Sequence, residues 1–275
     1  MGVEDPVVPF LKWPGGKRWL SARLAVIARK ALRGTYYEPF LGGGALFFAL
    51  LPERAVISDV NSDLVNTYKA TRDRAQEVIR RLKRLPVNKE TYDRLRAEVP
   101  HDPVRRAVRF LYLNRTAFGG IYRVNGNGKF NVPFGGGDRT PEVLWRRSLL
   151  IRASTALSGA EIRHDDFEPV INRVQRGDVV YCDPTYTVAH ENNGFVRYNE
   201  RNFSWADQVR LASAARRASA RGATVLVSNA QHRCVRRLYS GAAFQTVERH
   251  SLVSTDPRHR GPVSELLICL EPCSR

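Results

Sequence analysis

The chain has 275 residues, of which 43% are hydrophobic and 26% charged, and its 44 Lys and Arg exceed its 27 Asp and Glu by 17. These fractions indicate a folded chain and exclude a largely disordered one. No run of about 18 apolar residues occurs, so we expect no membrane span. The acidic start over 1–6 is not expected to be a secretory signal. At this length we expect one large domain, or one domain with an insertion.

The positive charge is concentrated in the middle of the chain. Residues 78–152 hold 17 Lys and Arg against 6 Asp and Glu. Such a field attracts polyanions, of which nucleic acid is the commonest. The four cysteines are Cys182, Cys234 and Cys269, which we expect in apolar strand-like runs, and Cys273 in the tail. Cysteines in such runs are typical of a reduced cytoplasmic protein. Their spacing is not that of zinc ligands, so we expect no metal site.

Strands and helices alternate in the first part of the chain. Apolar residues at helical spacing predict helices over 17–33, 45–51 and 62–72. Short apolar runs that end at glycine or at an acid predict strands over 36–40 and 55–59. This βαβ order is typical of a parallel sheet in an α/β fold.

The pattern then changes and later returns. Residues 78–85, 89–99 and 104–113 have amphipathic helical spacing, and Asn-Gly within 124–130 predicts a β-hairpin. The later part predicts a helix over 205–221 and strands over 161–163, 178–183, 223–229, 243–249 and 264–271. We therefore expect an α/β catalytic domain over 1–73 and 158–275, interrupted by a basic helical-plus-hairpin insertion over 74–157.

The first motif with chemical meaning is the glycine-rich segment over 38–44, Glu-Pro-Phe-Leu-Gly-Gly-Gly. Glycines after a strand let the backbone approach a ligand, and the next helix offers free N–H groups. Asp59 ends the next predicted strand, where a carboxylate can accept both hydroxyls of a ribose. An ordinary tight strand-to-helix turn remains the alternative.

The second motif is Phe-Leu-Lys-Trp-Pro-Gly-Gly-Lys over 10–17. Its Gly-Lys pair suggests a phosphate-binding P-loop, but Leu11 and Arg18 stand where glycine and Ser or Thr are required. A P-loop is therefore excluded. Lys17 at a helix start and the aromatic Trp13 suit a ligand with a carboxylate and a planar ring.

The third motif, Asp183-Pro184-Thr185-Tyr186, ends the apolar run over 179–182. Ligands of open parallel sheets bind at the carboxyl ends of the strands. The Asp carboxylate and the Pro184 carbonyl could accept the two hydrogens of an exocyclic amino group, and Tyr186 offers a stacking face. A plain Asx-Pro turn is the alternative.

Together these motifs resemble the Dam-type (D12 class) adenine-N6 DNA methyltransferases, in the family's order and across nearly the whole chain. Further segments extend the resemblance. The family's target-recognition region is similar to Leu113-Asn114-Arg115 with Phe118, 121–125 and 130–135. Residues 165–167 are similar to the segment that contacts the cofactor's adenine, and Val227-Ser228-Asn229 is similar to a later strand of the family. The resemblance implies a Rossmann-like sheet that binds S-adenosylmethionine, with the insertion as target-recognition domain.

The resemblance also implies roles for single residues. The catalytic group would be Asp183, Pro184 and Tyr186. Cofactor binding would fall to Trp13, Lys17, Glu38, Phe40, Gly42, Asp59, Asp166, Phe167 and Asp183. DNA binding would fall to Arg115, Phe118, Ile121, Arg123, Asn125, Asn131, Pro133 and Arg139.

The sequence departs from the family pattern at three positions. Thr185 replaces the second proline of the family's Asp-Pro-Pro-Tyr, and we expect activity to survive this change. Gly136 stands where members that methylate GATC have Arg, and Gly119 where a polar residue is common. A two-pronged contact from Arg to guanine is a major source of base discrimination. The expected target is GATC or a related site. Arg139 is the candidate to replace the missing Arg.

The implied reaction moves a methyl group to N6 of an adenine flipped out of duplex DNA, with no metal. We expect a cytoplasmic monomer of bacterial or phage origin, with a cognate restriction endonuclease acting separately, and a loop over 187–203 that closes over the site. A second such loop is expected over 254–260. Three alternatives stay open: N4-cytosine methylation, a DNA-binding homologue with impaired catalysis, and an RNA substrate.

Overall fold

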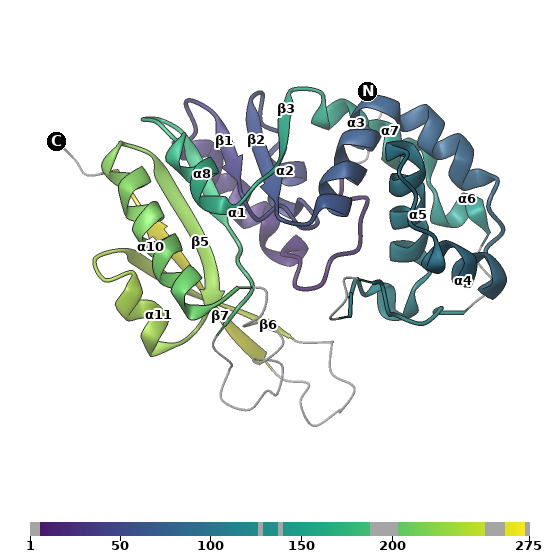
Figure 1. Cartoon of the computed structure of the whole chain (residues 1–275). Helices are drawn as coiled ribbons and strands as arrows, with labels where there is room; N and C mark the ends of the chain where they lie inside the picture. Colours follow the sequence, from purple (N-terminus) through teal and green to yellow (C-terminus); the bar gives the residue numbers. More distant parts are fainter. Residues whose placement is uncertain (1–5, 126–128, 137–139, 188–202, 251–261, 273–275) are drawn as a thin grey trace. The chain divides into compact units, whose positions relative to one another are not determined.

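The structure, a computed structural model, describes the chain except residues 1–5, 126–128, 137–139, 188–202, 251–261 and 273–275 (Figure 1). It divides into two compact units, each built from two stretches of chain. Unit 1 comprises Met1–Lys30 and Leu41–His164, and unit 2 comprises Ala31–Phe40 and Asp165–Arg275. No helix in the described ranges is both long enough and apolar enough to cross a membrane. The predicted loops over 187–203 and 254–260 lie almost wholly outside the described residues.

Unit 1 contains a parallel strand pair with helices around it. Strand β2 (Ala55–Asp59) pairs with β3 (Ala160–His164), and Ala55 lies opposite Ala160. Helices α1 (Arg18–Ala31) and α2 (Ala45–Leu50) precede β2 in the chain. The core here is aromatic, because Phe10, Phe48 and Tyr68 are all buried and contact one another at ring-centroid distances of 5.1 to 6.5 Å.

The rest of unit 1 is a helical layer built on the long helix α3 (Ser62–Lys83), against which α5 and α7 pack (Figure 1). Asn61 begins α3 by accepting hydrogen bonds from the backbone N–H groups of Asp63 and Leu64. The other elements of this layer are α4 (Lys89–Ala97), α5 (Pro103–Thr116), the 3-10 turn η1 (Phe118–Gly120), α6 (Pro141–Leu144) and α7 (Arg147–Leu157).

Helix α3 joins the two predicted helices over 62–72 and 78–85, and its backbone is not helical at a point between them. It is one element of 22 residues with a kink at Arg74, where φ is −134° and ψ is 29°. Buried residues continue along one face on both sides of the kink, so packing holds the helix together. The predicted domain boundary between residues 73 and 74 coincides with this kink, and the division into a catalytic domain and an insertion stays a prediction.

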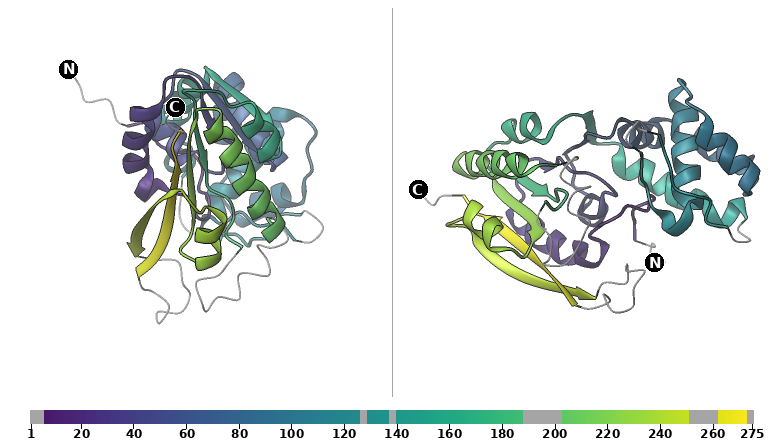
Figure 2. Two further views of the ribbon diagram at one scale, coloured as in Figure 1. Left: turned by 90° about the vertical axis from the view of Figure 1, so that its left-hand side faces the viewer. Right: turned by 60° about the horizontal axis from the view of Figure 1, so that its bottom comes forward.

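Unit 2 carries a five-stranded part of the sheet in the order β1-β4-β5-β7-β6. Strands β1 (Tyr36–Glu38), β4 (Val179–Cys182) and β5 (Thr224–Ala230) are parallel, and β7 (Pro262–Leu270) runs antiparallel to both β5 and β6 (Ala243–His250). Figure 2 shows β6 and β7 as a long ribbon. The helices of this unit are α8 (Phe167–Asn172), α10 (Trp205–Ala220), which packs on β5, and α11 (Arg233–Leu238).

The predicted α/β class is confirmed, since parallel strands alternate with helices and the chain's later strands form an antiparallel pair. β4 and β5 are buried along their full length, as expected for strands covered on both faces. One cysteine was misplaced: Cys182 and Cys269 lie in β4 and β7, but Cys234 lies in helix α11. Arg236 and Arg237 follow in the same short helix, and Val235 is its one buried residue. A segment with so few apolar residues to bury forms a surface helix more readily than a buried strand.

Candidate active site

The side chain of Asn114 links the segment over 10–17 to helix α5. The fully buried Asn114 accepts a hydrogen bond from the backbone N–H of Lys12 at 2.9 Å and donates one to its carbonyl at 2.7 Å. The indole of Trp13 then stacks on Tyr122, with ring centroids 5.4 Å apart. Lys17 is 5% exposed, and its Nζ donates to the carbonyl of Gly15 at 3.1 Å.

The glycine segment after β1 packs directly against this loop. Gly42 has φ +47°, and a Cβ there would lie 2.7 Å from the Trp13 ring. Gly44 has φ +66°, and a Cβ there would lie 2.9 Å from the Tyr68 hydroxyl. Both positions therefore require glycine, for backbone conformation and for space. A cavity of about 230 Å³ has Trp13, Gly16 and Gly43 among its lining residues, so the first two motifs share one hollow.

Asp59 ends β2 beside this glycine segment. Its Oδ2 accepts the N–H of Gly42 at 3.0 Å and its Oδ1 accepts the N–H of Asn61 at 2.9 Å. Burial raises the pKa of Asp59, while these backbone hydrogen bonds act in the opposite direction. Each oxygen can accept a further hydrogen bond. The arrangement therefore suits a pair of vicinal hydroxyl groups.

In unit 2, the first part of the glycine motif contributes a buried acid and an aromatic ring. Glu38 is 2% exposed, and the hydroxyl of Tyr36 donates to its Oε2 at 2.8 Å. Burial, and next the Glu38 carboxylate, raise the pKa of Tyr36 well above its usual value, so this hydroxyl remains a donor. Phe40 stacks on Phe167 with centroids 5.3 Å apart, and the Phe203 ring lies 5.5 Å from Phe40.

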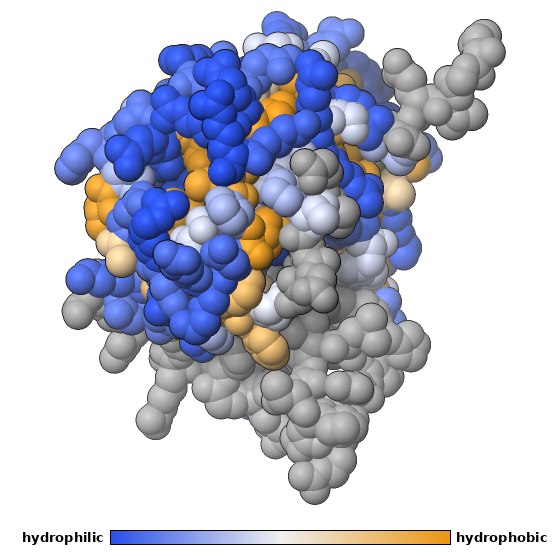
Figure 3. All heavy atoms as spheres, turned by 90° about the vertical axis from the view of Figure 1, so that its right-hand side faces the viewer, coloured by the Kyte–Doolittle hydropathy of each residue, from blue (hydrophilic) through white to orange (hydrophobic). Residues whose placement is uncertain are grey.

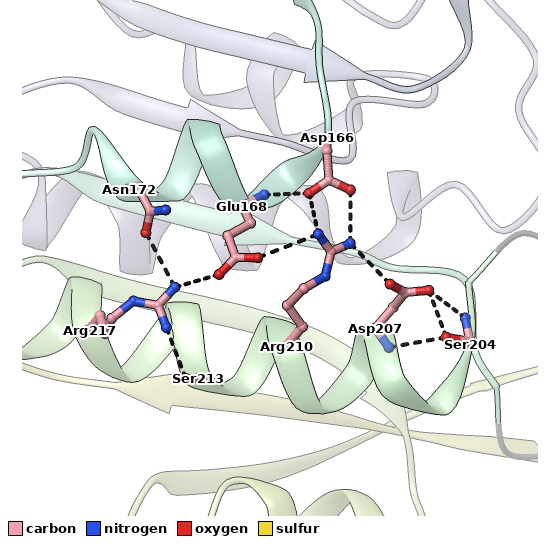
Figure 4. Close-up of polar contacts among 8 residues, drawn as sticks. All are labelled: Asp166, Glu168, Asn172, Ser204, Asp207, Arg210, Ser213 and Arg217. Atoms are coloured by element: carbon pink, nitrogen blue, oxygen red, sulfur yellow. Dashed lines mark hydrogen bonds and ion pairs between the residues drawn. The ribbon is translucent and has the colours of Figure 1, made fainter.

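The predicted cofactor segment at Asp166 and Phe167 is held by Arg210 of α10 (Figure 4). The guanidinium donates to both oxygens of Asp166, at 3.0 and 2.9 Å, and lies 4.3 Å from the centroid of the Phe167 ring. The Arg210 guanidinium also donates to one oxygen of Asp207, at 3.0 Å. The other oxygen of Asp207 completes the capping box with Ser204 at the start of α10. One arginine thus joins the beginnings of α8 and α10.

The third motif follows β4 directly. Pro184 is buried, Thr185 is exposed, and Tyr186 is half-buried with its hydroxyl donating to Oε2 of Glu265 at 2.9 Å. Burial raises the pKa of Tyr186 well above its usual value, and the carboxylates of Asp183 and Glu265 add to this. Thr185, which departs from the family pattern, therefore presents its side chain to solvent.

The pairing predicted for the hairpin is confirmed on either side of residues 126–128, with Val124 opposite Phe130 in antiparallel sense, and several of the predicted DNA-binding residues lie on it or beside it. Asn125 accepts the N–H of Lys129 with its side chain at 3.0 Å and donates its own N–H to the Lys129 carbonyl at 2.8 Å. Arg123 donates through Nε to Asn131 Oδ1 at 2.9 Å. The exposed predicted residues are Phe118, Ile121, Arg123, Asn125, Asn131 and Pro133.

Two apolar members of this set are exposed. Phe118 is 61% exposed and Ile121 40% exposed. Figure 3 views the side on which α4 and α6 lie, where hydrophilic residues dominate and apolar patches lie among them. A large exposed aromatic side chain is a candidate for contact with bases. Arg115 is half-buried in the last turn of α5, and Arg139 lies outside the described residues.

Two of the departures have a structural reason. Gly136 has φ +68° with no atom within 4 Å of a built Cβ, and Gly119 has φ +62°. Both lie in the left-handed region, where residues with a side chain are strained. Glycine at these positions therefore allows the left-handed backbone conformation.

Sequence reasoning missed several residues that hold the site. Asn114 appeared within a motif without a role, and Tyr36, Arg210 and Glu265 appeared in none. The available signal was a charged residue within an apolar strand, as Glu265 is within Val-Ser-Glu-Leu-Leu-Ile. Among the described residues, no group of three or more His, Cys, Asp or Glu could hold a metal ion.

Comparison with known proteins decides between the functions that this geometry allows. Residues 13–255 match the family described as D12 class N6 adenine-specific DNA methyltransferase. The chain belongs to this family. It is 34% identical over 270 residues to the type II methyltransferase M1.LlaDCHI of Lactococcus lactis subsp. cremoris, covering 94% of each chain. It is 33% identical over 270 residues to the DNA adenine methylase of Escherichia coli strain K12, covering 96% of this chain and 95% of the relative.

Membership makes the chain an adenine-specific DNA methyltransferase, with the α/β fold expected of this class. N4-cytosine methylation and loss of catalysis are accordingly not favoured. A solved structure of a candidate RNA methyltransferase from Pyrococcus horikoshii shows a distant likeness, with TM-score 0.42 and 11% identity over 99% of this chain and 92% of that one. That likeness has no bearing on the substrate.

Proposed function

We propose that the methyl donor is S-adenosylmethionine. The residues of unit 1 fit it: Asp59 offers acceptors for ribose hydroxyls, the Gly42 turn gives close backbone approach, and Trp13 with Lys17 suits the aminoacyl part. In unit 2, Glu38 offers a buried carboxylate, and Phe40, Asp166 and Phe167 form an aromatic and acidic surface suited to a purine. When bound, the cofactor supplies an electrophilic methyl group.

The catalytic proposal rests on one observation: β4 ends directly in Asp183-Pro184-Thr185-Tyr186, and Tyr186 is hydrogen-bonded to a buried carboxylate. The Asp183 carboxylate and the Pro184 carbonyl accept the two N6 hydrogens of a flipped adenine, which concentrates electron density on that nitrogen. The base stacks on the face of Tyr186.

Double-stranded DNA is the proposed substrate form. The basic insertion binds phosphates, which position the duplex without reading its sequence. Arg123 and the hairpin read base edges, and Phe118 inserts where the adenine leaves the stack, a step that costs a few kcal/mol. Arg115 also binds the DNA, and Arg139 takes the place of the missing Arg that would contact guanine.

The relatives suggest the biological setting. One is named a type II methyltransferase and others DNA adenine methylase, so we propose GATC or a related short target and either host protection or epigenetic control. We propose a monomer in the cytoplasm of a bacterial or phage-infected cell, where its DNA substrate lies. In a restriction-modification setting, a separate endonuclease would cut the unmethylated site.

The test is sequencing that detects modified bases in DNA from cells that express the wild type, Asp183→Ala or the control Asp73→Ala. Asp73 lies at an exposed ion pair with Arg72, at 2.7 Å. We expect N6-methyladenine in one short motif with the wild type and the control, and none with Asp183→Ala. Methylation that persists in Asp183→Ala would refute the catalytic assignment.

DNA binding is tested separately with Arg123→Ala and the control Arg236→Ala. Arg236 lies on α11 in unit 2 over the ring of Phe244, at 5.0 Å. We expect Arg123→Ala to weaken binding to the target duplex by about tenfold, the loss of one good base contact. Equal affinity of the two variants would exclude Arg123 from the DNA interface.

A further inference from the structure

A buried acid lies beside the catalytic motif, and the methylation chemistry leaves it unexplained. Glu265 is 1% exposed on β7, where the neighbouring residues 266–268 are all apolar and buried. A carboxylate in such a place costs free energy unless it accepts strong hydrogen bonds. Its Oε2 accepts the hydroxyl of Tyr186 at 2.9 Å.

The strand register explains how two residues so distant in sequence meet. β4 ends at Cys182, which lies opposite Val227 of β5. β5 continues to Ala230, which lies opposite Glu265 of β7. Glu265 therefore lies at the carboxyl end of the parallel strands, and the Tyr186 side chain bridges from the end of β4 past the end of β5 to reach it.

We propose that Glu265 is a positioning residue for adenine methylation: its carboxylate holds the para hydroxyl of Tyr186, so that the ring presents a fixed face to the flipped base. The proposal rests on the proposed role of Tyr186 as the stacking face. A hydrogen bond at the hydroxyl fixes the position of the phenol oxygen and so restrains the first side-chain torsion of Tyr186. The O–H bond of a phenol prefers the plane of its ring, so the direction of the Glu265 oxygen also favours one orientation of that plane. Stacking depends on the orientation of the ring plane, so this restraint acts on the base.

The hydroxyl is suited to this task because it remains a donor. Burial, the nearby Asp183 and Glu265 itself hold the pKa of Tyr186 well above its usual value. The phenol therefore stays protonated over the working pH range and keeps donating to Glu265. The fixed base in turn keeps its N6 hydrogens directed at Asp183 and Pro184.

The test compares Glu265→Ala with Glu265→Gln, whose side-chain carbonyl can still accept the hydroxyl. The substrate is a duplex that contains the site mapped by sequencing. We expect Glu265→Ala to lower kcat by about tenfold while KM for S-adenosylmethionine is unchanged, and Glu265→Gln to recover most of kcat. With 2-aminopurine in place of the target adenine, Glu265→Ala should lengthen the fluorescence lifetime, because the flipped base stacks less well on a Tyr186 ring that is no longer held.

Tyr239→Phe is the matched control. Tyr239 is a fully buried phenol of unit 2 whose hydroxyl has no hydrogen-bond partner among the described residues, so its removal should leave kcat and lifetime unchanged. The double variant Tyr186→Phe with Glu265→Ala should be no slower than Glu265→Ala alone, since both remove the same bond. Additive losses, or wild-type kcat and lifetime in Glu265→Ala, would overturn the proposal.

Two further variants keep the outcomes distinct. If Glu265→Ala fails to fold, Tyr186→Phe decides: it keeps the ring and removes only the bond, so a kcat loss of about tenfold supports the proposal and an unchanged kcat overturns it. Tyr186→Ala tests the proposed function itself. Full activity in Tyr186→Ala refutes the stacking role, whereas an inactive Tyr186→Ala beside a fully active Glu265→Ala refutes only the role of Glu265.

Discussion

Asn114 contacts both the N–H and the carbonyl of Lys12, at 2.9 and 2.7 Å, although 102 positions separate the two residues. This two-point contact is what a neighbouring β-strand would provide, but here one buried amide on helix α5 provides it. The segment that carries Trp13 and Lys17 therefore takes its position from the helix that ends at the predicted target-recognition region.

Replacement of Asn114 by alanine should destabilise unit 1 and loosen this segment. Two partly buried backbone groups lose their partners, which costs about 2 to 4 kcal/mol in the free energy of unfolding. Chemical denaturation measures this loss, and KM for the cofactor should rise in parallel. Asn66→Ala is the control, because its side chain donates to the Pro103 carbonyl at 2.9 Å in an exposed place. Equal losses in the two variants would contradict the argument.

Thr185→Pro should leave the reaction almost unchanged, although it restores the family's motif. The side chain of Thr185 is exposed, whereas the flanking Pro184 is buried and Tyr186 is held by Glu265. Steady-state kinetics should give kcat within about twofold of wild type, and Thr185→Ala should behave alike. A large gain in kcat would show that the threonine limits catalysis.

Arg210→Lys should raise KM for S-adenosylmethionine more than it lowers stability. Lysine cannot form the two-pronged contact with Asp166 or lie flat over Phe167. The ion pairs are partly solvent-exposed, so the stability change should be about 1 kcal/mol or less. Arg217→Lys is the control, since Arg217 contacts Glu168 at 2.7 Å and Asn172, away from the aromatic rings (Figure 4). A KM that stays constant in Arg210→Lys would separate this network from cofactor binding.

Cofactor binding should weaken in acid earlier than an ordinary aspartate would allow. Burial raises the pKa of Asp59 above its usual value, so this proposed acceptor for ribose hydroxyls becomes protonated at a higher pH. The effect of pH on folding stability is opposite in direction. The protonated carboxyl group of Asp59 stabilises the folded state, and this contribution is lost as pH rises through its folded-state pKa. KM for the cofactor, measured against pH, should rise on the acid side while kcat at saturation changes less. A KM independent of pH there would refute the role of Asp59.

The predicted elements succeed where one local pattern dominates. β4 and β5 are short apolar runs that end at polar residues, and the hairpin at Asn125 carries its own turn chemistry. Helix α7 was not predicted, although Leu150, Ala153 and Leu157 form its buried face at helical spacing. The predicted break between residues 72 and 78 falls at the kink of α3 at Arg74, and contacts with α5 and α7 join its two halves into one element.

The candidate site was predictable only in part, for a physical reason. Asp59, Gly42 and Tyr186 stand at strand ends or turns, where residue type itself indicates chemistry. Glu265 and Arg210 act through partners about 80 and 44 positions away, at Tyr186 and Asp166. Local sequence contains nothing about such pairings, which arise only when strand register and helix packing bring the side chains together.

Cys182, which immediately precedes the proposed catalytic Asp183, has consequences for chemical labelling. It is fully buried in β4, and burial raises the pKa of its thiol far above the usual range, so little reactive thiolate is available. Cys269 is half-buried with a pKa raised to about 11. Cys234, half-buried on α11, is the better attachment point for a maleimide dye among the described cysteines. A fluorophore can therefore be placed there without touching the residue next to the reaction centre.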